Sequence, residues 1–89
     1  MDIKLTKQFQ KKIELLLQSQ DYKIRFEKGN FKSGYCIIRD KKVIIINKYF
    51  TTEGKIYALI EIIELIKISK DKCNDENLRT LNKILKIEH

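Results

Sequence analysis

The segment that most constrains this fold is residues 56–68, in which apolar side chains cover most of the circumference of a predicted helix. A helix of this kind has to be buried on several sides. The chain has only 89 residues, so a single domain, residues 1–89, has to provide that cover. Either the other elements enclose the helix within one monomer, or part of its surface is a subunit interface.

The spacing of apolar side chains also predicts the preceding elements. Residues 2–19 repeat them every three or four positions, which predicts an amphipathic helix. Residues 21–28 alternate strictly, as a half-buried strand does. The β-branched segments 35–39 and 43–47 flank a short polar turn and predict an antiparallel hairpin. Residues 43–47 are apolar on both faces, so we expect them to form the central or most covered strand, although a short apolar run can also form a covered edge strand.

Two further helices are predicted in the C-terminal half. Thr51 or Thr52 can cap the helix that contains residues 56–68, and Asn74 can cap a last helix with an acidic first turn. The resulting order is α-β-β-β-α-α, which is an α+β domain. We expect a small three-stranded antiparallel sheet, arranged as a meander, with the helices packed on one face. The other face of the sheet is then uncovered.

The inventory of reactive side chains predicts a protein that is not an enzyme. The single histidine, His89, is the last residue, where chain ends fray. Cys36 lies in an apolar strand and Cys73 lies near the start of a helix, and neither belongs to a CxxC pair. Their separation also excludes the paired ligand spacing of a structural zinc site. We therefore expect reduced thiols, no metal and no cofactor.

The loop KGNFKSGY contains two glycines but lacks the GK[ST] ending of a phosphate-binding loop. We interpret it as a turn that needs a positive φ at Gly29, Asn30 or Gly34. No apolar run reaches the roughly 18 to 20 residues of a membrane span, and the charged N-terminal residues lack the apolar core of a secretory signal. These features predict a cytoplasmic protein.

The formal charge of +7 makes nucleic-acid binding one functional hypothesis. Residues 21–55 carry nine basic and four acidic side chains, so most of the excess lies on the predicted strands and turns. The 16 lysines far outnumber the three arginines, however, and a lysine excess serves solubility as well as recognition. Interleaved aromatic rings can stack on the bases of single-stranded RNA or DNA. The candidate residues for such a surface are Lys23, Arg25, Arg39, Lys41, Lys42, Lys48, Tyr35 and Tyr49.

The other functional hypothesis, which we place before nucleic-acid binding, is a protein-interaction module that binds another protein or forms a homodimer. It depends on the apolar excess of the helix through residues 56–68, because so short a chain has little surface with which to cover that helix. In this hypothesis, replacing Ile62 or Leu65 with lysine yields a folded monomer. The candidate interface residues are Tyr57, Ile62, Leu65 and Ile66.

A resemblance to known proteins lies in the central block, GNFKSGYCIIRDKKVIIINKYFTTEGKIYALIEIIELI. This block resembles a family of short bacterial proteins of about this length, which has no assigned function. Its hairpin and capped helix are also similar to part of the ImmA/IrrE-type metallopeptidases, whose helix carries an HExxH zinc motif. Here Ile60 and Glu64 stand in place of both histidines, and only Glu61 matches. The resemblance therefore implies a non-catalytic relative.

Overall fold

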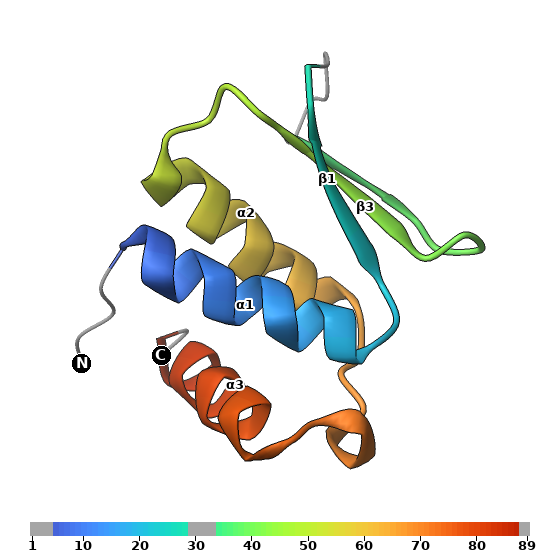
Figure 1. Ribbon diagram of the computed structural model, residues 1–89, viewed down its shortest axis with the longest axis vertical. Helices are drawn as coiled ribbons and strands as arrows, with labels where there is room; N and C mark the ends of the chain where they lie inside the picture. Colours follow the sequence, from blue (N-terminus) through green and yellow to red (C-terminus); the bar gives the residue numbers. More distant parts are fainter. Residues whose placement is uncertain (1–4, 29–33, 88–89) are drawn as a thin grey trace.

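The computed structural model of the chain describes residues 5–28 and 34–87 (Figure 1). The order of elements is α-β-β-β-α-α with one 3-10 turn, which confirms the predicted α+β class. The elements are α1 (Lys7–Ser19), β1 (Lys23–Glu27), β2 (Tyr35–Ile38), β3 (Val43–Asn47), α2 (Thr52–Leu65), η1 (Lys70–Lys72) and α3 (Asp75–Ile87).

Each of the three α-helices begins after a residue whose side chain caps it. Thr6, Thr51 and Asn74 each accept a hydrogen bond from the backbone amide three residues further on, at 3.2, 3.0 and 2.7 Å. These bonds satisfy amides that have no partner within the helix. α2 ends at Leu65, earlier than the apolar pattern through residue 68 predicts, because Ile66 has an extended backbone. Asn74 was a predicted cap and Thr51 was one of two candidates, whereas the Thr6 cap, which starts α1 later than the predicted residue 2, and the end of α2 were not predicted.

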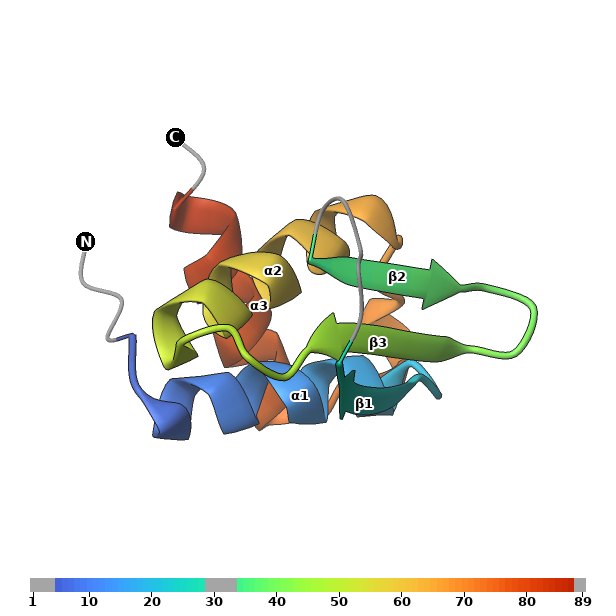
Figure 2. The same cartoon turned by 90° about the horizontal axis from the view of Figure 1, so that it is seen from above.

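The sheet differs from the predicted antiparallel meander. Its strand order is β1-β3-β2, with β1 parallel and β2 antiparallel to β3 (Figure 2). The hairpin of β2 and β3 and the central position of β3 are confirmed, but the neighbour of β1 was predicted wrongly. In a meander, β3 would be an edge strand with an open side. The observed order instead pairs this apolar strand on both sides, which satisfies more of its backbone groups.

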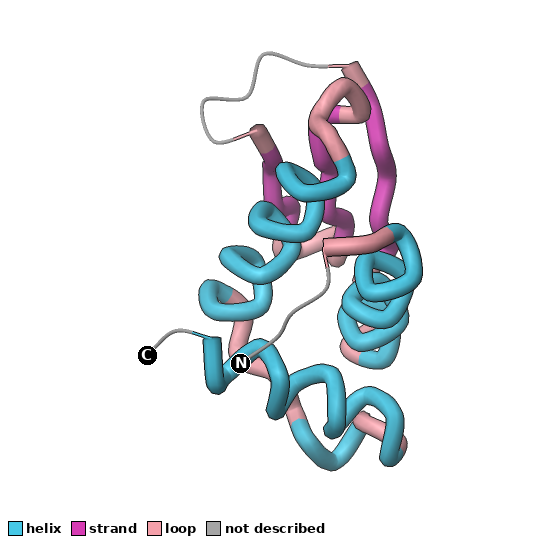
Figure 3. Tube along the Cα trace, turned by 90° about the vertical axis from the view of Figure 1, so that its left-hand side faces the viewer, coloured by secondary structure: helices cyan, strands magenta, loops and turns pink. Residues whose placement is uncertain are grey.

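All described helices lie on one side of the sheet (Figures 1 and 3). α1 and α2 pack against the sheet, and α3 packs against α1 on the side away from the strands (Figure 1). Ile44 and Ile46 of β3 point into this core and are fully buried. The other fully buried side chains are Ile13, Leu16, Leu17, Ile56, Leu59, Ile62 and Ile84.

The expected positive φ falls on Gly34, at 81°. Gly29, Asn30 and His89 lie outside the described residues. None of the helices in the described part of the chain combines the length and apolar character that a bilayer crossing requires.

Candidate interaction surface

The sheet face opposite to the helices, here called the open face, has no described helix packed on it (Figure 1). Side chains alternate along a strand, so the residues on either side of the buried Ile44 and Ile46 point to this face. The strand register arranges most of them in two rows across the sheet. One row is Lys23, Val43 and Ile38, and the next is Arg25, Ile45 and Cys36.

Each row of the open face runs from a basic side chain on β1 to aliphatic or thiol side chains on β3 and β2. Lys23 and Arg25 are exposed, while the apolar members are half-buried. Arg25 Nη2 forms an ion pair with Glu27 Oε2 at 2.6 Å. Both side chains remain well exposed, so this pair contributes only about 0–1 kcal/mol. The open face is therefore an aliphatic strip with a basic edge.

The other basic candidates near the hairpin turn do not join the open face. Arg39 Nη2 donates to the carbonyl of Leu65 at 3.4 Å, at the C-terminal end of α2. Lys42 Nζ lies 5.6 Å from the centre of the Tyr22 ring and 3.5 Å from the carbonyl of Gln20. Both side chains thus contact the helical side of the sheet. Lys41 is exposed at the turn.

The remaining pair of candidates, Lys48 and Tyr49, lies at the other end of β3. Lys48 Nζ is 5.3 Å from the centre of the Tyr49 ring, and Tyr49 is 68% exposed. The length of a five-residue strand, about 16 Å, separates this pair from the hairpin turn. The eight residues proposed for nucleic-acid binding therefore lie in several places, and only Lys23 and Arg25 belong to the open face.

Tyr35 lies on the helical side of β2, where it packs against the core. Its hydroxyl donates a hydrogen bond to Glu61 Oε1 of α2 at 2.7 Å. Burial of the ring, followed by the hydrogen bond to Glu61 and its negative charge, raises the pKa of Tyr35 to about 12. This contact joins β2 to α2. Because the Tyr35 ring lies on the helical side of the sheet, it is not available for stacking on a base at the open face.

Ionisation of Tyr35 is expected to depend on Glu61. Glu61→Gln removes the negative charge, so the pKa of Tyr35 should fall from about 12 toward its ordinary value of 10.0. Because the pKa is raised in the folded state, the stability from neutral Tyr35 is complete below pH 10.0 and is lost as the pH rises through about 12. NMR of the labelled tyrosine ring carbon measures this titration. Glu53→Gln on the same helix is the control, and an unchanged pKa of Tyr35 in Glu61→Gln would exclude the contribution of Glu61 and leave burial as the cause.

The four candidate interface residues, three in α2 and Ile66 directly after it, divide into two pairs. Ile62 is fully buried and Ile66 is 4% exposed, and both belong to the core of the monomer. Tyr57 and Leu65 are 55% and 50% exposed. Most of the apolar surface of α2 is thus enclosed within one chain, and Ile62 and Ile66 are inaccessible to a partner. Tyr57 and Leu65 remain on its outer side.

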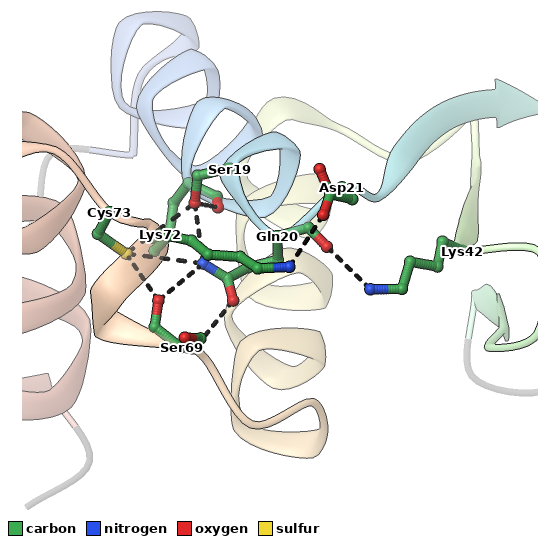
Figure 4. Close-up of polar contacts among 8 residues, drawn as sticks. Ser19, Gln20, Asp21, Lys42, Ser69, Lys72 and Cys73 are labelled. Atoms are coloured by element: carbon green, nitrogen blue, oxygen red, sulfur yellow. Dashed lines mark hydrogen bonds and ion pairs between the residues drawn. The ribbon is translucent and has the colours of Figure 1, made fainter.

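A buried glutamine that the sequence did not single out joins three elements (Figure 4). Gln20, at the end of α1, accepts from the amide of Ser69 through Oε1 at 2.7 Å and donates to its carbonyl through Nε2 at 3.2 Å. The same Nε2 lies 3.0 Å from Ser19 Oγ and 3.7 Å from Cys73 Sγ. Gln20 therefore holds the connection between α2 and α3 against the end of α1, which is a structural role.

An exposed ion pair lies beside this glutamine (Figure 4). Lys72 Nζ is 3.0 Å from Asp21 Oδ2, and the hydrogen bond and charge of Lys72 hold the pKa of the Asp21 carboxyl below its ordinary 3.8. Asp21 has a positive φ of 69° in the turn between α1 and β1. Asp tolerates this conformation better than most residues because its short side chain can bond locally.

The described residues offer little for metal or cofactor chemistry. They contain no group of three histidine, cysteine, aspartate or glutamate side chains that could hold a metal ion. Cys36 and Cys73 are free thiols. A hollow of about 420 Å³ between α1 and α3 is lined by Lys12 and mainly polar neighbours. Its two buried members, Asn77 and Thr80, are already hydrogen-bonded within α3 and its cap.

Comparisons with protein-family models, with curated proteins and with solved structures found no match. The open face combines half-buried apolar side chains with the positive charge of Lys23 and Arg25.

Proposed function

We propose that this protein is a non-enzymatic protein-interaction module and that its open face binds an acidic segment with an apolar side. The observation that carries this proposal is the pattern of the two rows. Val43, Ile45 and Ile38 form the strip that apolar side chains of a partner can cover, and Lys23 and Arg25 form the edge that acidic side chains can meet. An amphipathic helix with glutamates beside its apolar side has this chemistry.

The same pattern favours a protein over single-stranded nucleic acid. Proteins that bind single strands use aromatic rings on which bases stack. None of the described strand residues on the open face is aromatic, whereas Phe26 and Tyr35 pack toward the helices. Two free thiols suit a reducing compartment, which supports a cytoplasmic location.

The proposal is tested by NMR titration of the ¹⁵N-labelled protein. The probe is a synthetic helical peptide with leucines at positions i, i+3, i+4 and i+7 and glutamates on both flanks. We expect shifts in the amides of residues 23–27, 36–38 and 43–47, because these residues form the open face. A second peptide with lysines in place of the glutamates should bind much more weakly, since it opposes Lys23 and Arg25.

A charge-reversal variant tests whether the acidic peptide binds at the open face. Arg25→Glu should weaken binding of the acidic peptide by about tenfold, which is about 1.4 kcal/mol. Lys11→Glu changes the net charge equally on the exposed side of α1 and should leave the affinity unchanged. Equal effects of both variants, or shifts outside the open face, would contradict the proposal. Binding of a uridine-rich RNA with no binding of the acidic peptide would replace it by the nucleic-acid alternative.

A further inference from the structure

The two edges of the sheet differ in their protection against another strand. β1 carries Lys23, Arg25 and Glu27, and charged side chains on an edge strand discourage pairing. β2 has the sequence Tyr-Cys-Ile-Ile and carries no charge. In the described part of the chain, β3 is its only strand neighbour. The β2 edge is thus the edge that can accept another strand.

The hydrogen-bond pattern shows which backbone groups of β2 are available. The amide of Asn47 donates to the carbonyl of Gly34 at 2.9 Å, so this pair is a hydrogen-bonded one. Hydrogen-bonded and non-hydrogen-bonded pairs alternate along an antiparallel ladder. Cys36, two residues after Gly34, therefore bonds to β3 through its backbone. Tyr35 and Ile37 lie between these positions and direct their N–H and C=O groups away from β3. β2 therefore presents two residues with outward backbone donors and acceptors.

We propose that a second copy of this chain docks at the β2 edge and forms a continuous antiparallel sheet around a two-fold axis at Cys36. In this register, Tyr35 of one copy pairs with Ile37 of the other, and the reverse pair forms by symmetry. The outward N–H and C=O groups of Tyr35 and Ile37 in both copies then form hydrogen bonds across the junction. A shift that centres the axis on Ile37 would pair Tyr35 with Arg39, which lies in the turn beyond the strand.

The outer side of α2 adds apolar surface next to this edge. The contacts of Tyr35 with Glu61 and of Arg39 with the Leu65 carbonyl show that α2 runs alongside β2 in the same direction. The two-fold axis therefore makes the two copies of α2 antiparallel on either side of the junction. Tyr57 and Leu65 are exposed, and each is four residues from Glu61 along α2, so they share the helix face that contacts Tyr35.

The area and charge of this surface set the expected strength of the dimer. Four-residue edges alone bury less than the roughly 1,600 Å² of a standard interface, so the α2 side chains are needed for a stable dimer. The two Glu61 carboxylates bring like charges toward each other and oppose association. The expected dimer is therefore a reversible one.

Dimerisation would also join the open faces of the two copies. The apolar strip would then run across β3 and β2 of both copies, with the basic β1 edges on its outer sides. This consequence rests on the proposed function, because it enlarges the same binding face. The dimer itself does not depend on that function, and the two are tested separately.

Analytical ultracentrifugation over the micromolar to millimolar range tests the dimer. We expect the full chain to sediment as a concentration-dependent dimer. Cys36→Lys places two like charges at the axis, on the open face and outside the core, so it should give a monomer whose circular dichroism is unchanged. Arg25→Glu lies two strands, or about 10 Å, from the β2 edge and should remain dimeric while losing affinity for the acidic peptide.

Disulfide cross-linking tests the register in a Cys73→Ser background. Opposed residues of a pair that is not hydrogen-bonded have Cα atoms about 4.5 Å apart, within the range of a disulfide. Diamide, which takes up two electrons and two protons from the two thiols, should therefore link Cys36 of both copies. In Cys36→Ser/Ile38→Cys, the new thiols lie about 13 Å apart in this register and should not be linked.

The outcomes separate this inference from the proposed function. A chain that sediments as a monomer at every concentration overturns the dimer, whatever its affinity for the acidic peptide. A dimer that persists in both Cys36→Lys and Leu65→Lys places the interface elsewhere and also overturns it. Equal cross-linking at positions 36 and 38 overturns the register. A dimer at the β2 edge that fails to bind the acidic peptide would leave this inference standing and remove only the proposed function.

Discussion

Ile62→Lys is expected to unfold the protein, although the sequence pattern suggested a folded monomer. Ile62 is fully buried in the core that α2 shares with α1 and the sheet. Its replacement removes a packed side chain and buries an unpaired charge, which together cost about 5 kcal/mol or more. A domain of this size has a free energy of unfolding of roughly 5–10 kcal/mol. Loss of the cooperative urea transition, followed by circular dichroism, measures the effect.

Leu65→Lys is the matched change on the same helix, three residues away. Leu65 is half exposed, so the lysine ammonium can reach water and the free energy of unfolding should change by less than about 1 kcal/mol. A native-like urea transition in Ile62→Lys, or unfolding of Leu65→Lys, would contradict this assignment of the buried and outer sides of α2. In the proposed dimer, Leu65→Lys should also shift sedimentation toward the monomer without unfolding the chain.

Gly34→Ala is expected to lower the free energy of unfolding by about 3 kcal/mol. Gly34 has a φ of 81°, which strains any residue with a Cβ atom. An added Cβ would also overlap the ring of Phe50, which packs against the core. The chain would have to move either the start of β2 or this ring. Urea denaturation at neutral pH measures the change.

Gly54→Ala is the same chemical change, but we expect it to raise the free energy of unfolding. Gly54 lies in the first turn of α2, and an added Cβ would meet its nearest neighbours at 3.4 Å or more, which is ordinary contact. Alanine is a better helix former than glycine, so we expect stabilisation by about 0.5–1 kcal/mol. If Gly34→Ala and Gly54→Ala lowered the free energy of unfolding by equal amounts, the positive φ and the Phe50 contact would not be the cause of the loss at Gly34.

Much of the local structure was predictable because it depends on neighbouring residues. Strict alternation located β1, and the β-branched segments located the hairpin with β3 at the predicted bounds, Val43–Asn47. Asn74 was predicted as a cap, and Thr51 was one of two candidates with Thr52, because such side chains accept from amides only three residues away. The end of α2 was missed, because the apolar pattern continues through Ile66 and Ile68, which contact the core from outside the helix.

The candidate surfaces were less predictable, because they depend on which side of an element faces the core. Charge alone grouped Lys23 and Arg25 with Arg39 and Lys42, but the latter two contact the helical side of the sheet. The role of Gln20 had no signal in the sequence, since its partner Ser69 lies 49 positions away.

The sequence by itself determined the helices, the strands, their order and the α+β class, because periodicity and capping report contacts within a few residues. Only the tertiary structure decided that β1 pairs with β3 in parallel, which side of α2 is enclosed, and which face of the sheet is open. Those choices follow from non-local packing: strands on both sides of β3 satisfy its backbone groups, while Ile44 and Ile46 pack against the helices. The central position of β3 leaves β2, an uncharged strand, at the edge.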